Sequence, residues 1–184
     1  MILLGSVVNG GAVVVGGLVG MFVGKLLPER LRTSVMAALS LMTIGIAVPG
    51  LLKSNNALIP IISMVVGTLI GELLDIDSTV NKLGEKLQKR FSGSRVTEGF
   101  VTGSLVFAVG ALAVMGPLES GLQHQHSLLF SKSVIDGVAS IVFASTMGLG
   151  VALSGITVFV VEGSIALLAS VVAPYLGEAV VNEI

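Results

Sequence analysis

Few side chains in the apolar parts of this chain are able to do chemistry, and three of them stand out. Asp136, Glu162 and Asn9 interrupt long stretches that otherwise hold apolar, small or hydroxyl residues. A carboxylate in such surroundings is costly to bury, so it requires a partner or a wet cavity. We therefore predict that these three residues contact an ion or a small solute.

Each of the three residues also has a purely structural interpretation. Lys132 precedes Asp136 by one helical turn, so the two can form an ion pair at the outer end of a helix. Glu162 has no cation in its own stretch, and it is either a proton or cation site or a neutral, hydrogen-bonded carboxyl. Asn9 either coordinates a solute or hydrogen-bonds between helices.

Small residues accompany these groups at helical spacing. Asp136, Ser140 and Gly148 belong to a ridge with a residue at every fourth position over 136–152, and Gly150 lies beside it. We predict that Ser140, Gly148 and Gly150 complete the substrate- or ion-binding site, since small residues permit close backbone approach and glycines loosen a helix. Plain packing between helices is the alternative, and it is also expected of the four-spaced Gly16, Gly20, Gly24, Gly67 and Gly71.

The composition identifies the elements that must position these residues. Of 184 residues, 53% are apolar and only 11% are charged, and the mean hydropathy is +1.01. So few charges cannot cover the surface of a soluble domain, and the hydrophobicity excludes disorder. A membrane span needs about 20 apolar residues. The prediction is an all-α, polytopic membrane bundle of about six helices: 2–24, 31–52, 57–74, 96–117, 132–153 and 156–176.

The six predicted spans form one membrane domain with two halves. Residues 1–74 and 99–184 each supply three spans, and 75–98 links them with an amphipathic helix in which apolar residues recur over 80–91. Segment 40–50 matches segment 145–155 at five of eleven positions, which suggests a duplication. Because three spans are an odd number, the second copy would enter the membrane inverted, as in many transporters. The turn between the last two spans is expected at Ser154-Gly155.

Basic residues predict the orientation. Eight of the ten Lys and Arg residues fall in 25–32 and 75–98, which places both loops in the cytoplasm and the N-terminus outside. The chain has no cysteine, nucleotide-binding motif or nucleophile–base pair, and His124 and His126 lack a third ligand. We therefore expect no enzymatic activity, cofactor or metal site. The net charge of −1 argues against nucleic acid as a partner, and we expect contact with the lipid bilayer and a homo-oligomer.

Several strings of the sequence are similar to a known family. They lie at 5–10 (GSVVNG), 27–30 (LPER), 67–76 (GTLIGELLDI), 130–151 (FSKSVIDGVASIVFASTMGLGV) and 162–165 (EGSI). Together they resemble the bacterial membrane-protein family catalogued as domain of unknown function 554, over essentially the whole chain. The resemblance implies a multi-pass inner-membrane protein, described in the family as uncharacterised or as a transport protein, and it supplies no substrate. It also implies glutamine where this chain has Glu162.

The sequence therefore predicts a small secondary transporter or channel for an ion or small solute. The alternative is a membrane scaffold or regulatory subunit that transports nothing and binds a partner protein. In that case the small-residue ridges are helix interfaces and Lys132–Asp136 is a structural pair.

Overall fold

The computed structural model describes residues 1–53, 58–75 and 94–175, together with positions 78 and 82. This part of the chain is helical and contains no strand. Short 3-10 turns, η1 (Gly24–Leu26) and η2 (Ala173–Tyr175), follow the first and last helices. The helices are α1 (Leu4–Val23), α2 (Glu29–Lys53), α3 (Leu58–Leu73), α5 (Ser94–Ala108), α6 (Ala111–Gln123), α7 (Ser127–Met147) and α8 (Leu149–Val172).

Three of these helices are long and apolar enough to cross a membrane. They are α1, α7 and α8, and the bent pair α5 and α6 provides a fourth span if the two are counted together. The prediction of a helical membrane protein is therefore confirmed. The prediction of six spans is not confirmed, because the described residues contain three such helices, or four spans with the bent pair.

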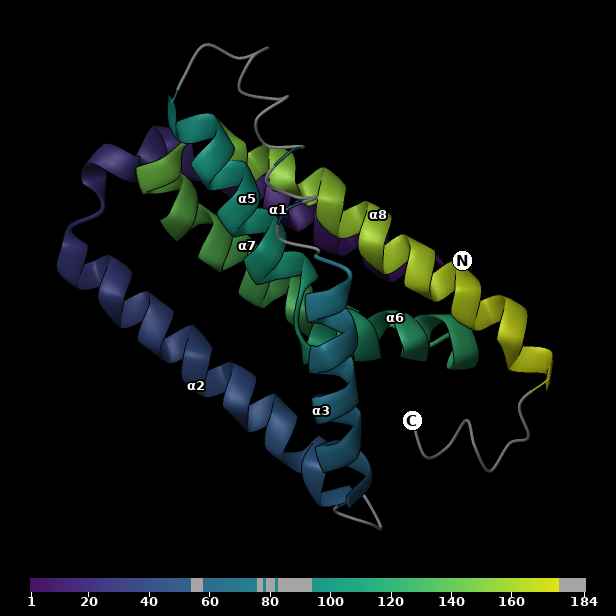
Figure 1. The fold of residues 1–184 in the computed structure, drawn as a ribbon. Helices are drawn as coiled ribbons and strands as arrows, with labels where there is room; N and C mark the ends of the chain where they lie inside the picture. Colours follow the sequence, from purple (N-terminus) through teal and green to yellow (C-terminus); the bar gives the residue numbers. More distant parts are fainter. Residues whose placement is uncertain (54–57, 76–77, 79–81, 83–93, 176–184) are drawn as a thin grey trace.

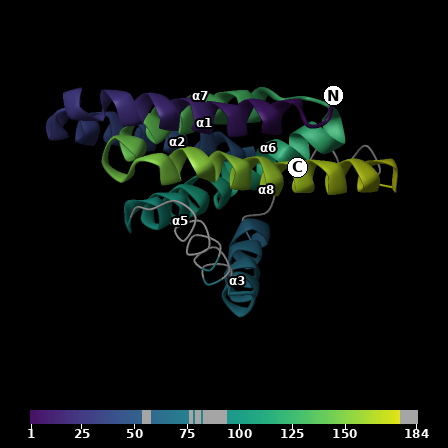
Figure 2. The ribbon, with the colours of Figure 1, turned by 90° about the horizontal axis from the view of Figure 1, so that it is seen from above.

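A central bundle of α1, α5, α7 and α8 holds the buried core (Figure 1). Val13, Val151 and Val158 are completely buried there, and Phe107 packs edge-on against Phe143 with ring centroids 5.9 Å apart. Figure 2 shows α1 lying between α7 and α8, with α5 on the other side of α8. The polar residues singled out in α1, α7 and α8 thus belong to helices that touch one another.

Glycines set the close approach of α1 to its neighbours. Gly16 lies against Gly137 and Ser140, and Gly24 lies against Ser145, so α1 and α7 run parallel. A Cβ atom on Gly16 or Gly20 would overlap backbone oxygens of α7. The predicted packing role of the Gly16, Gly20 and Gly24 stripe is therefore confirmed.

Helices α2 and α3 lie outside this bundle (Figure 1). Leu41 of α2 and Leu69 of α3 keep 70% and 61% of their surface exposed. The space around Gly45, Gly67 and Gly71 is open, so no helix of the described part approaches these glycines. Apolar side chains exposed in this way suit contact with lipid or with another protein chain.

The turn between the last two spans lies six residues earlier than predicted. Helix α7 begins at Ser127 and ends at Met147, and α8 continues through Ser154-Gly155 without a break. Gly148 connects them with φ +73° and ψ −146°, a backbone conformation that is nearly exclusive to glycine. The conformational demand at Gly148, rather than the midpoint of the apolar run, decides where the chain turns.

Gly148→Ala is expected to lower the free energy of unfolding by about 1–3 kcal/mol, because alanine is strained at this backbone conformation. No atom lies within 4 Å of the position where its Cβ would stand, so steric overlap does not contribute. Thermal unfolding of the detergent-purified protein measures the change. A variant as stable as the wild type would show that α7 and α8 do not turn at Gly148.

The predicted span 96–117 is also wrong as a single straight helix. The chain bends by 55° between α5 and α6, near Gly110, and α6 then contains Pro117 within its length instead of ending there. Proline lacks the N–H that an inner helical turn donates, which weakens the local backbone hydrogen bonding of α6. The amphipathic helix expected over 80–91 falls outside the described residues, apart from position 82.

Candidate functional site: a buried polar cluster

Three helices bring four polar side chains together inside the bundle. Asn9 comes from α1, Lys132 and Asp136 from α7, and Glu162 from α8. All four are buried: Asn9 and Glu162 have no exposed surface, and Lys132 and Asp136 retain 5% and 6%. We call these four residues the polar cluster. Asp136 and Glu162 lie near the middle of α7 and α8, and Asn9 and Lys132 lie in the second turns of α1 and α7.

Asn9 connects the two acidic residues. Its Nδ2 donates to Asp136 Oδ2 at 3.1 Å and to Glu162 Oε1 at 2.8 Å. The predicted hydrogen bond of Asn9 between helices is therefore present, and its acceptors are the two carboxylates that the sequence also selected. The glycines around Asn9 allow α1 to come close enough for these bonds, since Gly10 packs directly on Gly155.

Lys132 supplies the positive charge of the polar cluster. Its Nζ forms an ion pair with Asp136 Oδ2, lies 3.3 Å from Glu162 Oε1, and donates to the backbone oxygen of Phe107 at 2.7 Å. The ion pair with Asp136, one of the two alternatives for this residue, is present. Because α7 starts at Ser127 rather than at 132, the pair spans the second and third turns of the helix instead of its first turn.

Two members of this site were not selected as binding residues from the sequence. Lys132 was considered only as a structural partner of Asp136, because its distance from Glu162 depends on how α7 and α8 pack. The Phe107 carbonyl on α5 gives no sequence signal at all. The one sequence signal for Lys132 was its position one helical turn before Asp136, because a lysine side chain is long enough to reach beyond its nearest neighbour.

The remaining predicted site residues lie outside the polar cluster. Ser140 is buried one turn after Asp136, and its hydroxyl donates to the Gly137 oxygen while packing against Gly16. Gly148 ends α7, and Gly150 packs against the backbone of Val96 and Phe100 in α5. These three positions therefore shape and pack the helices that carry the cluster.

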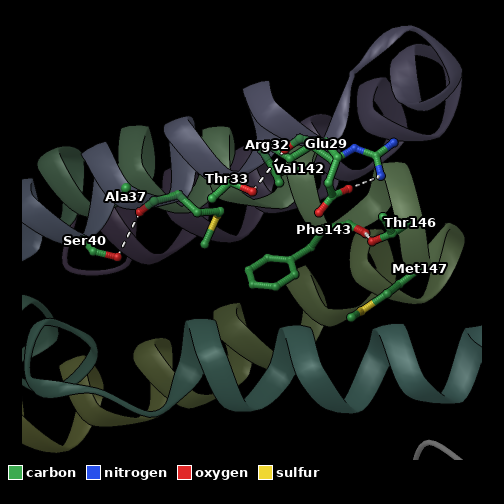
Figure 3. A pocket seen from close by; sticks show the side chains of 10 residues that line it. Glu29, Arg32, Thr33, Ala37, Ser40, Val142, Phe143, Thr146 and Met147 are labelled. Atoms are coloured by element: carbon green, nitrogen blue, oxygen red, sulfur yellow. Dashed lines mark hydrogen bonds and ion pairs between the residues drawn. The ribbon is translucent and has the colours of Figure 1, made fainter.

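A groove of about 490 Å³ lies between α2 and α7, away from the polar cluster (Figure 3). Met36, Phe143 and Met147 give it an apolar wall. At the polar end of the groove, Arg32 Nη1 lies 3.5 Å from Glu29 Oε2, and Arg32 Nη2 donates to the backbone oxygen of Gly24 at 2.8 Å. None of the four cluster residues lines this groove, so we do not include it in the candidate site.

The fold and the polar cluster define a helical membrane protein with ionisable groups buried among its apolar helices. The chain belongs to the family described as protein of unknown function (DUF554), whose model matches residues 4–184. The family suggested by the sequence strings is thus confirmed.

Two curated relatives carry names that are equally general. The uncharacterized membrane protein YdfK of Bacillus subtilis (strain 168) is 28% identical over 186 residues, which cover 99% of this chain and 80% of the relative. The uncharacterized protein YqgA of Escherichia coli (strain K12) is 26% identical over 178 residues, which cover 93% of this chain and 76% of the relative. No solved structure gives a significant match.

Proposed function

We propose that this protein is a small secondary transporter or channel that moves an ion or small solute across the bacterial inner membrane. The observation that carries the proposal is the polar cluster, in which Asn9, Lys132, Asp136 and Glu162 from three helices meet in a buried position. Intramembrane ionisable groups are expensive to insert and commonly mark ion or substrate pathways.

Two buried hydroxyls extend the polar interior away from the cluster. Ser6 lies one turn before Asn9 on α1, and Ser104 lies one turn before Phe107 on α5. Both side chains are at most 1% exposed, and neither Oγ has a hydrogen-bond partner among the described residues. Unpaired buried hydroxyls of this kind are suited to hydrogen-bond a passing water or solute.

The directions of the helices place these two hydroxyls on opposite sides of the cluster. Gly10 of α1 packs against Gly155 and Gly17 against Ala152, so α1 runs antiparallel to α8. Gly99 of α5 packs against Val151 and Gly103 against Ser154, so α5 runs parallel to α8 and antiparallel to α1. Ser6 precedes Asn9 and Ser104 precedes Phe107 by one turn each. Because α1 and α5 are antiparallel, the two serines are displaced from the cluster in opposite directions. This arrangement favours a route through the bundle over a closed polar island.

The finer architecture in this proposal rests on the sequence. It comprises six spans, halves 1–74 and 99–184 related as an inverted repeat, cytoplasmic loops 25–32 and 75–98, and a homo-oligomer. The aligned segments 40–50 and 145–155 differ in local structure, since the first lies within α2 and the second contains the break at Gly148. We therefore propose that the two halves share the order of their spans in inverted orientation, and not that their helices begin and end at matching positions.

A membrane scaffold or regulatory subunit is the second candidate. The exposed apolar surfaces of α2 and α3 and the open space at Gly67 and Gly71 favour it, because a partner helix fits closely against such glycines. In this case the polar cluster would only hold α1, α7 and α8 together.

Flux into proteoliposomes separates the two candidates. The panel contains protons, Na⁺, K⁺, amino acids and small organic acids, tested with the wild type, Asp136→Asn and Ser131→Ala. We expect at least one solute to move and its flux to fall about tenfold or more in Asp136→Asn, since this change removes one charge from the cluster.

Ser131→Ala is the matched control on the same helix. Ser131 is exposed and its hydroxyl donates to the backbone of its own helix, so its loss is expected to leave flux unchanged. If no solute moves, or if Asp136→Asn transports as well as the wild type, the transport proposal fails and the scaffold function is favoured.

A further inference from the structure

The polar cluster carries an unbalanced formal charge. Lys132 contributes +1, and Asp136 and Glu162 each contribute −1, which leaves −1 in a site with almost no exposed surface. Asn9 of α1 and the Phe107 carbonyl of α5, which complete the first ring of contacts, carry no charge. The desolvation cost of buried charges is offset only when opposite charges and hydrogen bonds compensate it. With both carboxylates ionised, this cluster lacks one positive charge.

The hydrogen bonds of the cluster are unbalanced in the same sense. The three N–H groups of the Lys132 ammonium have three oxygen neighbours, in Phe107, Asp136 and Glu162, and both N–H groups of the Asn9 amide donate to carboxylates. The unused groups are acceptors: Asn9 Oδ1 and Glu162 Oε2 are buried and have no partner among the described residues. A further ligand must therefore bring positive charge or donors, and an anion would find no unused donor on Lys132 or Asn9.

From this balance we infer that the polar cluster binds one monovalent cation, on the side of Asn9 Oδ1 and Glu162 Oε2, while Lys132 neutralises Asp136. These two oxygens belong to the two side chains that the Asn9–Glu162 hydrogen bond joins, one on α1 and the other on α8. A divalent ion would leave an excess of +1, and a neutral solute would leave the deficit in place. The inference specifies a monovalent cation as the ligand of the polar cluster. Only the claim that this cation is transported rests on the proposed function.

The proton and an alkali ion are the two forms of this ligand. An alkali ion would be held by the two free oxygens, since carbonyl and carboxylate oxygens suit hard cations. A proton would instead sit on Glu162 and turn its free oxygen into a hydroxyl. Both forms supply the missing charge, and the experiment below distinguishes them.

Variants that change the charge of the cluster test the inference. Radioactive Na⁺ binding to purified protein is measured by equilibrium dialysis at neutral and alkaline pH, with K⁺ as competitor. Difference infrared spectra of the same samples report a protonated buried carboxyl. We expect the wild type to show either one Na⁺ per chain or one buried carboxyl that is protonated at neutral pH and loses its proton at alkaline pH. Glu162→Gln, whose cluster is neutral, is expected to show at least a tenfold loss of the corresponding signal.

Lys132→Met is the complementary variant, because it raises the deficit to −2. It is expected to gain binding of a divalent ion such as Ca²⁺, or of a second monovalent ion, that the wild type lacks. The double variant Lys132→Met/Asp136→Asn returns the deficit to −1 and is expected to bind one monovalent cation again. It also keeps the test valid if Lys132→Met alone does not fold.

The inference is overturned if the wild type shows neither bound Na⁺ or K⁺ nor a carboxyl that changes its protonation between the two pH values, or if Glu162→Gln retains the wild-type signal. Its failure is distinct from failure of the proposed function. One bound cation without any flux would leave the inference standing and make the cation structural. Flux that depends on Asp136 with no cation bound would keep the transport proposal and reject the inference.

Discussion

Lys132→Met is expected to lower the free energy of unfolding by about 3–5 kcal/mol, the range found when one partner of a buried ion pair is removed. The substitution removes the ammonium group that contacts both Asp136 and Glu162, and it deprives the Phe107 carbonyl of its donor. Methionine fills a similar volume, so the loss is mainly electrostatic. Unfolding of detergent-solubilised protein in a denaturant series measures the change.

Arg30→Met is the matched control for loss of a basic residue. Arg30 is exposed at the start of α2, and an exposed charge contributes about 1 kcal/mol or less. Similar stabilities of the two variants would mean that Lys132 is not a buried counter-charge.

Gly16→Ala is expected to lower the free energy of unfolding by about 1–3 kcal/mol, the usual effect of overpacking. The new methyl group would overlap Ser140 Oγ and the Gly137 oxygen, and the second of these belongs to the backbone, which cannot rotate away. Helix α1 must then move away from α7 at Gly16, two turns after Asn9 on the same helix. We therefore also expect weaker solute or cation binding, measured together with stability by ligand-dependent thermal unfolding.

Gly11→Ala provides the control on the same helix. No atom lies within 4 Å of the position of its Cβ, and alanine is the better helix former. This variant is expected to be as stable as the wild type or slightly more so. If both alanine variants behave alike, the close packing of α1 on α7 is wrong.

The sequence was sufficient to identify the helical membrane class and the three polar residues that meet. Long uncharged stretches permit few alternatives to helices in a membrane, since backbone groups must pair internally. Asn9, Asp136 and Glu162 were conspicuous because polar groups are rare in such stretches. Their mutual contact was not predicted, because it depends on how α1 packs against α7 and α8.

The errors concern breaks within continuous apolar runs. The run from Val134 to Leu176 holds only two charged residues, Asp136 and Glu162, so hydropathy does not indicate where α7 ends. The positive φ at Gly148 was visible only in the structure. The bend between α5 and α6 was missed for the same reason. The part played by Lys132 was underestimated because its contact with Glu162 joins residues 30 positions apart in different helices.

The most direct measurement of the polar cluster is a double-mutant cycle between Lys132 and Glu162. It compares the unfolding free energies of wild type, Lys132→Met, Glu162→Gln and the double variant. If the two side chains meet as described, the double variant is more stable than the additive sum by about 0.5–3 kcal/mol, because Glu162→Gln relieves the charge that Lys132→Met exposes. Strict additivity would contradict the cluster, and with it the site proposed here.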